Sequence, residues 1–285
     1  MGLPFLGLIN CEKRALSHNA IGQNLSLGAV RRGKRRWKPC FILSGTGADL
    51  RVKPNVLDSP LAKSFRVIVY DQRGLGQTQK PFGSYEMEDY SNDAIALLDK
   101  LDIDNVHLVG VSFGGMVALH VALQHPERIK KIVLCCTSPG GVFASFPFHD
   151  LPDDQTTTQR AMQLMEFNDL RHTRSWQKNN ANSVNAMIKA LNSRLIKDHV
   201  TPEFKRGYHE QIQARSRHNV VADLDRIKSE TLICAGFCDG IAPKENQKVM
   251  FERIPGSRCQ FYNGGHLFLF EDQKAWGDII EFLAN

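Results

Sequence analysis

The chain has 285 residues, of which 42% are apolar and 23% are charged, and its formal net charge at pH 7 is +6. This length and this mixture suffice for one large core with an inserted segment, and they exclude a disordered or fibrous protein. No stretch is apolar for long enough to span a bilayer, and residues 1–10 lack the basic start and small-residue cleavage site of a secretory signal. We therefore expect a cytoplasmic protein without a membrane span.

Three strand-like runs open the chain, at residues 23–30, 40–44 and 66–71. Between the first two lies a basic run, residues 31–38, which contains six Lys and Arg side chains. Such a run can mark a contact with nucleic acid or with a membrane surface. Its single aromatic residue, Trp37, provides little for stacking on bases, so a solvated hairpin loop is the better interpretation. We expect no nucleic-acid partner.

A helical pattern at residues 86–101 precedes an apolar strand at residues 106–111. That strand leads into Gly-Val-Ser-Phe-Gly and then into a second helical pattern, so Ser112 is expected at the apex of a sharp turn. A nucleophile elbow strains its central residue and needs almost no side chain two positions before and after it, where this chain has Gly110 and Gly114. A short Gly-Ser pattern also occurs in ordinary turns, so the context has to decide.

The amino-acid composition changes after the elbow. A strand is expected at residues 132–137, whereas residues 139–221 lack apolar strands and are rich in Gln, Asn, Met and charged side chains in a helix-like pattern. Strands that alternate with helices predict a mostly parallel sheet with helices on both faces. We expect a core domain formed by residues 1–138 and 222–285, and a helical cap at 139–221 that covers the site as a lid.

A reactive serine requires a base, and the base requires an acid that holds its tautomer. The apolar run 231–237 predicts a buried strand, and Asp239 follows its C-terminal end, at the edge where open parallel sheets build their sites. A further short strand at 259–262 leads into an Asn-Gly-Gly turn and His266, before a closing helix at 274–283. Both partners are therefore found in the order acid, then histidine.

Each member of this set also has a plainer interpretation. Ser112 could bond its own backbone in a turn, and Asp239 could cap the turn beside Gly240. The order of the three residues, and the place of the acid between a buried strand and Pro243, favour catalytic roles. No other histidine follows a glycine turn like that of His266, so the other nine are interpreted as surface or structural residues.

With these motifs the chain resembles the α/β-hydrolase family, from about residue 21 to the C-terminus. Three further pieces match: residues 41–47 resemble the strand and loop that supply the family's other oxyanion amide, residues 67–77 its D-x-R-G-x-G turn, and residues 254–256 the connection before its last strand. The resemblance implies an α/β fold, namely a mostly parallel sheet with helices on both faces and an inserted helical cap. Within the family, the chain resembles the branch of serine esterases and carbon–carbon bond hydrolases that have a helical cap.

The resemblance also implies a role for each site residue. Ser112 is the nucleophile, His266 the base and Asp239 the acid, while the backbone amides of Thr46 and Phe113 form the oxyanion hole. Many members have a histidine where this chain has Ser44, which leaves open how the oxyanion loop is braced. In the neighbouring turn, Asp71 and Arg73 are expected to be structural and to pin the turn by a charge-assisted bond.

The expected reaction is acyl transfer to water by a carboxylesterase that acts on small to medium, fairly apolar esters. His266 takes the proton of Ser112 during attack, and water later releases the acid from the acyl-enzyme. Three alternatives stay open: a carbon–carbon bond hydrolase for ring-cleavage products, a lactonase, and a proline iminopeptidase suggested by Asp-Gln-Arg-Gly at 71–74. A hydrolase-fold ligand receptor is less favoured because it needs no intact triad.

Other site types find little support. The seven cysteines include no C-x-x-C pair, and several lie in apolar runs, so they are interpreted as reduced and packed. No spacing of histidine or carboxylate resembles a zinc or calcium site, and the Gly-Leu-Gly at 74–76 is only a fragment of a dinucleotide fingerprint. We expect no metal and no cofactor. The expected partner is a small-molecule ester, and a homodimer stays open.

Overall fold

The computed structural model describes residues 37–152, 156–194 and 200–285. The strand expected at residues 23–30 and most of the basic run 31–38 lie outside the described residues, as does Cys11. The six cysteines within them are free thiols, four of which are fully buried.

Within these residues six strands form one sheet in which all neighbouring strands are parallel, in the order β2-β1-β3-β4-β5-β6. The strands are β1 (Pro39–Leu43), β2 (Arg66–Val69), β3 (Val106–Val111), β4 (Ile129–Cys135), β5 (Glu230–Gly236) and β6 (Arg258–Tyr262). Their sequences are nearly continuous apolar runs, which is typical of parallel strands buried on both faces. The predicted class is confirmed.

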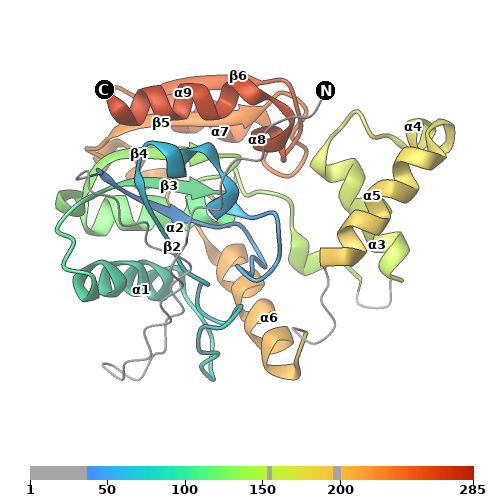
Figure 1. The fold of residues 1–285 in the computed structure, drawn as a ribbon, viewed down its shortest axis with the longest axis horizontal. Helices are drawn as coiled ribbons and strands as arrows, with labels where there is room; N and C mark the ends of the chain where they lie inside the picture. The colour runs from blue at the N-terminus through green and yellow to red at the C-terminus, as the bar shows by residue number, and fades with distance from the viewer. Residues whose placement is uncertain (1–36, 153–155, 195–199) are drawn as a thin grey trace, which may run out of the picture.

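Helices cover both faces of this sheet (Figure 1). The described helices are α1 (Met87–Lys100), α2 (Phe113–Gln124), α3 (Thr157–Asn168), α4 (Arg174–Asn179), α5 (Ala181–Arg194), α6 (Pro202–Arg217), α7 (Lys244–Arg253), α8 (Phe268–Glu271) and α9 (Gln273–Ala284). Apolar side chains of α1, α2 and α7 form one core with one face of the sheet. Those of α9 and residues 56–65 form a second core on the other face.

Strand β4 begins at Ile129 and ends at Cys135, whereas the sequence pattern predicts residues 132–137. Two consecutive lysines, at 130 and 131, interrupt the apolar pattern near the start of the strand. In the fold the ammonium of Lys131 donates to the Phe282 carbonyl oxygen at 3.0 Å and pairs with Glu230 at 3.0 Å. A lysine can therefore occupy a strand position because its aliphatic stem packs while its charged end finds partners at the rim.

The turn after β2 is held by two separate contacts. The carboxylate of Asp71 accepts the amides of Leu50 and Gln77, at 2.8 and 2.9 Å. Arg73 forms two hydrogen bonds of 2.9 Å with Asp93 of α1. The two charged residues thus tie the turn to different neighbours. Arg73 anchors it to α1, whereas Asp71 closes the turn at Gln77 and joins it to the loop after β1 at Leu50.

Helices α3 to α6 form the segment between β4 and β5. Figure 1 shows α3, α4 and α5 to one side of the sheet, with α6 returning toward it. Helix α3 begins with a capping box, in which Thr156 and Gln159 bond each other's backbone amides. Helix α6 begins with Thr201 as its cap and proline at its first position. The predicted change from strands to helices is explained by these start signals.

The chain enters and leaves this segment side by side. The amide of Val220 donates to the Pro139 carbonyl oxygen at 2.8 Å, and that of Gly141 donates to the His218 carbonyl oxygen at 3.2 Å. These bonds make a short antiparallel neck between Gly140 and Asn219. The helical segment is therefore anchored to the sheet at both of its ends by one hydrogen-bonded neck.

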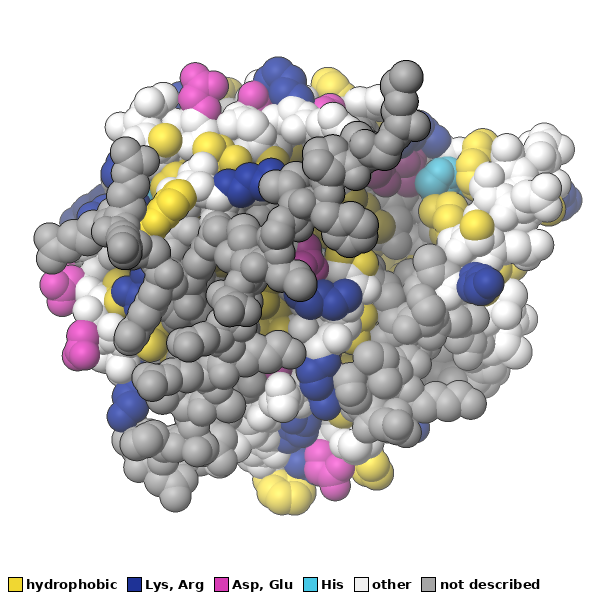
Figure 2. All heavy atoms as spheres, in the orientation of Figure 1, with side chains coloured by type: hydrophobic (Ala, Val, Ile, Leu, Met, Phe, Trp, Pro, Cys, Tyr) yellow, Lys and Arg dark blue, Asp and Glu magenta, His cyan; other side chains and the backbone are white. Residues whose placement is uncertain are grey.

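The described surface carries charges of both signs. Figure 2 shows lysine and arginine side chains interspersed with acidic, apolar and uncharged ones on the face turned to the viewer. None of the helices that the structure describes has the length and apolarity needed to cross a membrane.

Candidate active site

Ser112 lies at the tip of β3, in the turn that opens α2. Its φ of 54° and ψ of −118° fall in a region that non-glycine residues rarely adopt. A Cβ atom at Gly114 would lie 2.0 Å from the Leu43 carbonyl oxygen, and one at Gly110 would lie 2.5 Å from the Gly114 carbonyl oxygen. The close approach of helix and strands therefore requires glycine at both positions, as the spacing predicts.

The structure brings the three predicted side chains into one hydrogen-bonded chain. His266 Nε2 lies 3.0 Å from Ser112 Oγ, and His266 Nδ1 lies 2.8 Å from Asp239 Oδ2. A carboxylate only accepts, so this network assigns the proton to Nδ1 and leaves Nε2 as the acceptor of the serine hydroxyl. The Asp239 side chain is fully buried and that of His266 is 10% exposed.

The carboxylate of Asp239 is oriented by its own loop after β5. Its Oδ1 accepts the amides of Ile241 and Ala242, at 2.8 and 2.9 Å. With Oδ1 held by two backbone donors, Oδ2 faces the imidazole at the shorter distance. The acid is thus fixed by backbone geometry, so its orientation does not depend on a further side chain.

The end of α3 contacts both loops of the site. The amide of Gly240 donates to the Phe167 carbonyl oxygen at 3.0 Å, and the amide of His266 donates to the Asn168 carbonyl oxygen at 2.5 Å. The glycine before the histidine is needed here, because a Cβ at Gly265 would lie 2.0 Å from that same Asn168 oxygen. The helical segment therefore positions the loops that carry the acid and the histidine.

The loop after β1 lies next to the serine. A Cβ at Gly45 would be 3.5 Å from Ser112 Cβ, an ordinary contact distance. The amide of the next residue, Thr46, has no hydrogen-bond partner among the residues that the structure describes. Phe113 is the first residue of α2, where backbone amides have no partner within the helix. The two predicted amides therefore come from the loop and the helix start that flank Ser112.

Two glutamines brace this loop, and the sequence analysis missed both. Gln72 Nε2 donates to the Ser44 carbonyl oxygen at 2.6 Å, and the amide of Gly47 donates to Gln211 Oε1 at 2.8 Å. Gln72 lies within the matched turn and could have been suspected there. Gln211 could not, because it reaches the loop from α6.

A histidine pair joins α2 to the neck. His120 Nε2 lies 3.1 Å from His218 Nδ1, and His218 Nε2 lies 3.0 Å from the Ser138 carbonyl oxygen. Since that carbonyl only accepts, His218 donates to it and accepts from His120. Burial lowers the pKa of His218 to about 3 and also lowers the pKa of His120. Both rings are therefore neutral at neutral pH and serve packing.

Comparison with known proteins gives consistent results. A model of the alpha/beta hydrolase fold family matches residues 39–273. The poly(3-hydroxyalkanoate) depolymerase of Ectopseudomonas oleovorans is 28% identical over 88% of this chain and 86% of its own. The 2-hydroxymuconate semialdehyde hydrolase of Pseudomonas putida is 28% identical over 87% of each chain. The structure of the enol-lactonase from Burkholderia xenovorans is similar over 93% of this chain and 98% of its own, with a TM-score of 0.74 and 21% identity.

Proposed function

The chain belongs to the alpha/beta hydrolase fold family, and we propose that it is a serine hydrolase that cleaves small to medium carboxylic esters through an acyl-enzyme on Ser112. One observation carries the proposal: a single imidazole, that of His266, is hydrogen-bonded to both the hydroxyl of Ser112 and the carboxylate of Asp239. A serine hydroxyl becomes a useful nucleophile when such a base accepts its proton.

In the proposed first step Ser112 Oγ attacks the ester carbonyl carbon while His266 Nε2 accepts the hydroxyl proton. Asp239 stabilises the resulting imidazolium and keeps Nδ1 protonated. The carbonyl oxygen becomes negatively charged and is bound by the amides of Thr46 and Phe113. Collapse breaks the bond to the alcohol, which leaves with the proton from His266.

The second step is hydrolysis of the acyl-enzyme. A water molecule gives its proton to His266 and attacks the acyl carbon, and the serine leaves with that proton as the acid is released. We propose that residues 139–221 form the cap over this site. The bonds from the end of α3 to the two active-site loops support this proposal, because they hold that helix against the loops of Asp239 and His266.

A carbon–carbon bond hydrolase is the second candidate. It is favoured by the likeness to the 2-hydroxymuconate semialdehyde hydrolase, which extends over most of both chains. A lactonase would use the same nucleophile, base and oxyanion amides, since a lactone is an internal ester.

A panel of chromogenic substrates tests the proposal and separates it from its alternatives. We expect the wild-type protein to hydrolyse p-nitrophenyl butyrate faster than a ring-cleavage diketone, a six-membered lactone or proline p-nitroanilide. Varying the acyl chain from two to twelve carbons then locates the optimum length. Faster cleavage of the diketone would replace the esterase proposal by that of a carbon–carbon bond hydrolase. Absence of turnover on the whole panel would count against enzymatic activity.

A further inference from the structure

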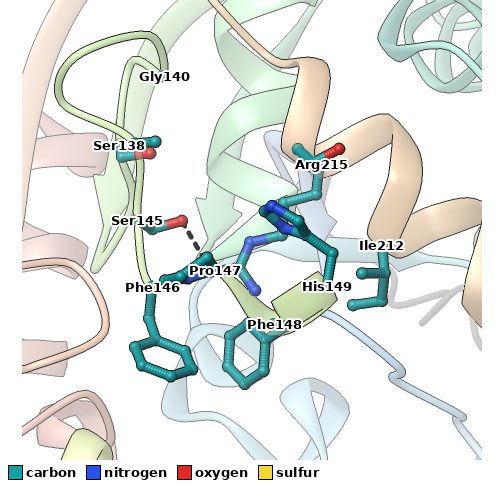
Figure 3. A pocket seen from close by; sticks show the side chains of 11 residues that line it. Ser138, Gly140, Ser145, Phe146, Pro147, Phe148, His149, Ile212 and Arg215 are labelled. Atoms are coloured by element: carbon teal, nitrogen blue, oxygen red, sulfur yellow. Dashed lines mark hydrogen bonds between the residues drawn. The ribbon is translucent and has the colours of Figure 1, made fainter. Parts of the chain in front are cut away.

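A small cavity lies between α6 and the segment that follows the neck. Its lining includes Ser138, Ser145, Phe146, Phe148, Ile212 and Arg215 (Figure 3). About 50 Å³ is open to the centres of water molecules. A single water needs roughly 10–15 Å³ on this measure, so the cavity has room for a group of a few atoms.

Arg215 extends from α6 into this cavity, and only 7% of the residue is exposed. Its Nη2 donates to Ser145 Oγ at 2.7 Å, and its guanidinium carbon lies 4.2 Å from the centre of the Phe148 ring. Its Nε and Nη1 are buried without a hydrogen-bond partner among the described residues. A guanidinium has five N–H donors, so most of its hydrogen-bonding capacity is unused.

The guanidinium of Arg215 likewise forms no direct ion pair with any residue that the structure describes. Burial lowers the pKa of Arg215 to about 10, which leaves the side chain charged at neutral pH. The carboxylate whose charge acts on it is that of Asp239, and this group already accepts two backbone amides and His266. A buried charge without a directly bonded counter-charge is costly. The charge and the unused N–H groups of Arg215 would therefore bind an anion in this cavity, and the described residues do not supply one.

The helix that lines the cavity also holds the oxyanion loop. Gln211, which holds the oxyanion loop at Gly47, precedes Arg215 by four residues, or about 6 Å along α6. Gln211 Nε2 is also buried without a partner. On the other side, the amide of Phe146 donates to the Ile241 carbonyl oxygen, next to the loop of Asp239. Helix α6 therefore carries two buried side chains with unused N–H donors, Gln211 at the oxyanion loop and Arg215 at the cavity.

We propose that Arg215 binds a carboxylate of the substrate at the end remote from the scissile bond. The preferred substrates are then monoanions, such as half-esters of dicarboxylic acids, rather than fully apolar esters. A carboxylate only accepts hydrogen bonds and forms strong, charge-assisted bonds with guanidinium, which fits the unused N–H groups of Arg215. This inference rests on the proposed function for the position of the scissile bond.

The kinetic test compares two substrates that differ only in charge: mono-p-nitrophenyl adipate and its neutral methyl ester. The wild-type protein is expected to show at least a tenfold higher kcat/KM for the monoanion. In Arg215→Met the KM for the monoanion is expected to rise roughly 10- to 100-fold, the effect of a lost bond to a charged group. The constants for the neutral diester should change less than about threefold. Arg215→Lys should recover part of the preference because it restores the charge.

Arg217→Met is the matched control, because Arg217 lies on the same helix but is exposed and pairs with Glu86. It should retain the wild-type preference. Equal losses on both substrates in Arg215→Met would assign the arginine a structural role and overturn the proposal. A wild-type protein that does not prefer the monoanion would overturn it as well.

A binding measurement gives an answer even if no ester is hydrolysed. Calorimetry on Ser112→Ala, with monomethyl adipate and dimethyl adipate as the probes, is expected to show tighter binding of the monoanion. Adding Arg215→Met should abolish that difference. Equal binding of the two probes by Ser112→Ala would refute the carboxylate site, whereas an absence of hydrolysis alone would refute only the proposed function.

Discussion

Replacing Ser112 by alanine is expected to lower kcat for p-nitrophenyl butyrate by roughly 10⁴- to 10⁶-fold. Ser112 Oγ lies 3.0 Å from His266 Nε2, and alanine removes this oxygen without adding volume to the elbow. The residual rate should exceed the uncatalysed one, because the proposed oxyanion hole, formed by the amides of Thr46 and Phe113, would still stabilise an oxyanion formed by direct attack of water.

The control for this variant is Ser175→Ala, since Ser175 is exposed on α4. Both variants should keep the circular dichroism spectrum and melting temperature of the wild type, so that a difference in turnover reports chemistry rather than folding. Turnover by Ser112→Ala within tenfold of the wild type would remove this residue from the mechanism.

Asp239→Asn is expected to lower kcat by about 10⁴-fold while the fold stays intact. In the wild type Oδ1 accepts the amides of Ile241 and Ala242, so the asparagine oxygen has to take that place. Its amide nitrogen then faces His266 Nδ1 and donates to it. The proton of the imidazole moves to Nε2, which can no longer accept the proton of Ser112.

Steady-state kinetics of Asp239→Asn test this tautomer argument. KM should change little, because the side chain is buried behind the histidine and does not reach the substrate. Asp225→Asn, an exposed position before β5, should behave as the wild type. A fall in kcat of less than tenfold for Asp239→Asn would show that the imidazole is oriented by another group.

The sequence predicts the sheet and the elbow well because both depend on local patterns. Each parallel strand is a short apolar run bounded by turn residues, and the elbow at Ser112 requires glycine at fixed positions. The edges of the elements are less accurate, as Lys131 shows, because a long polar side chain can lie in a strand once the fold provides partners for its end.

The buried polar residues near the site could not be predicted in the same way. Gln211 and Arg215 belong to a polar helix whose pattern does not reveal which side chains will be buried, and their surroundings form only when the chain returns to the sheet through the neck. The support that Phe167 and Asn168 give to the two loops comes from carbonyl groups, which every residue type carries. Such long-range contacts leave no local signal in the sequence.

Covalent labelling with a fluorophosphonate, followed by peptide mass spectrometry, tests the central claim most directly. Such a probe phosphonylates a serine only where a base and an oxyanion hole activate it. We predict one adduct per chain, on the peptide that contains Ser112, and none on the Ser112→Ala variant. An adduct at a different residue, or an unlabelled wild-type protein, would contradict the claim that Ser112 is an activated nucleophile.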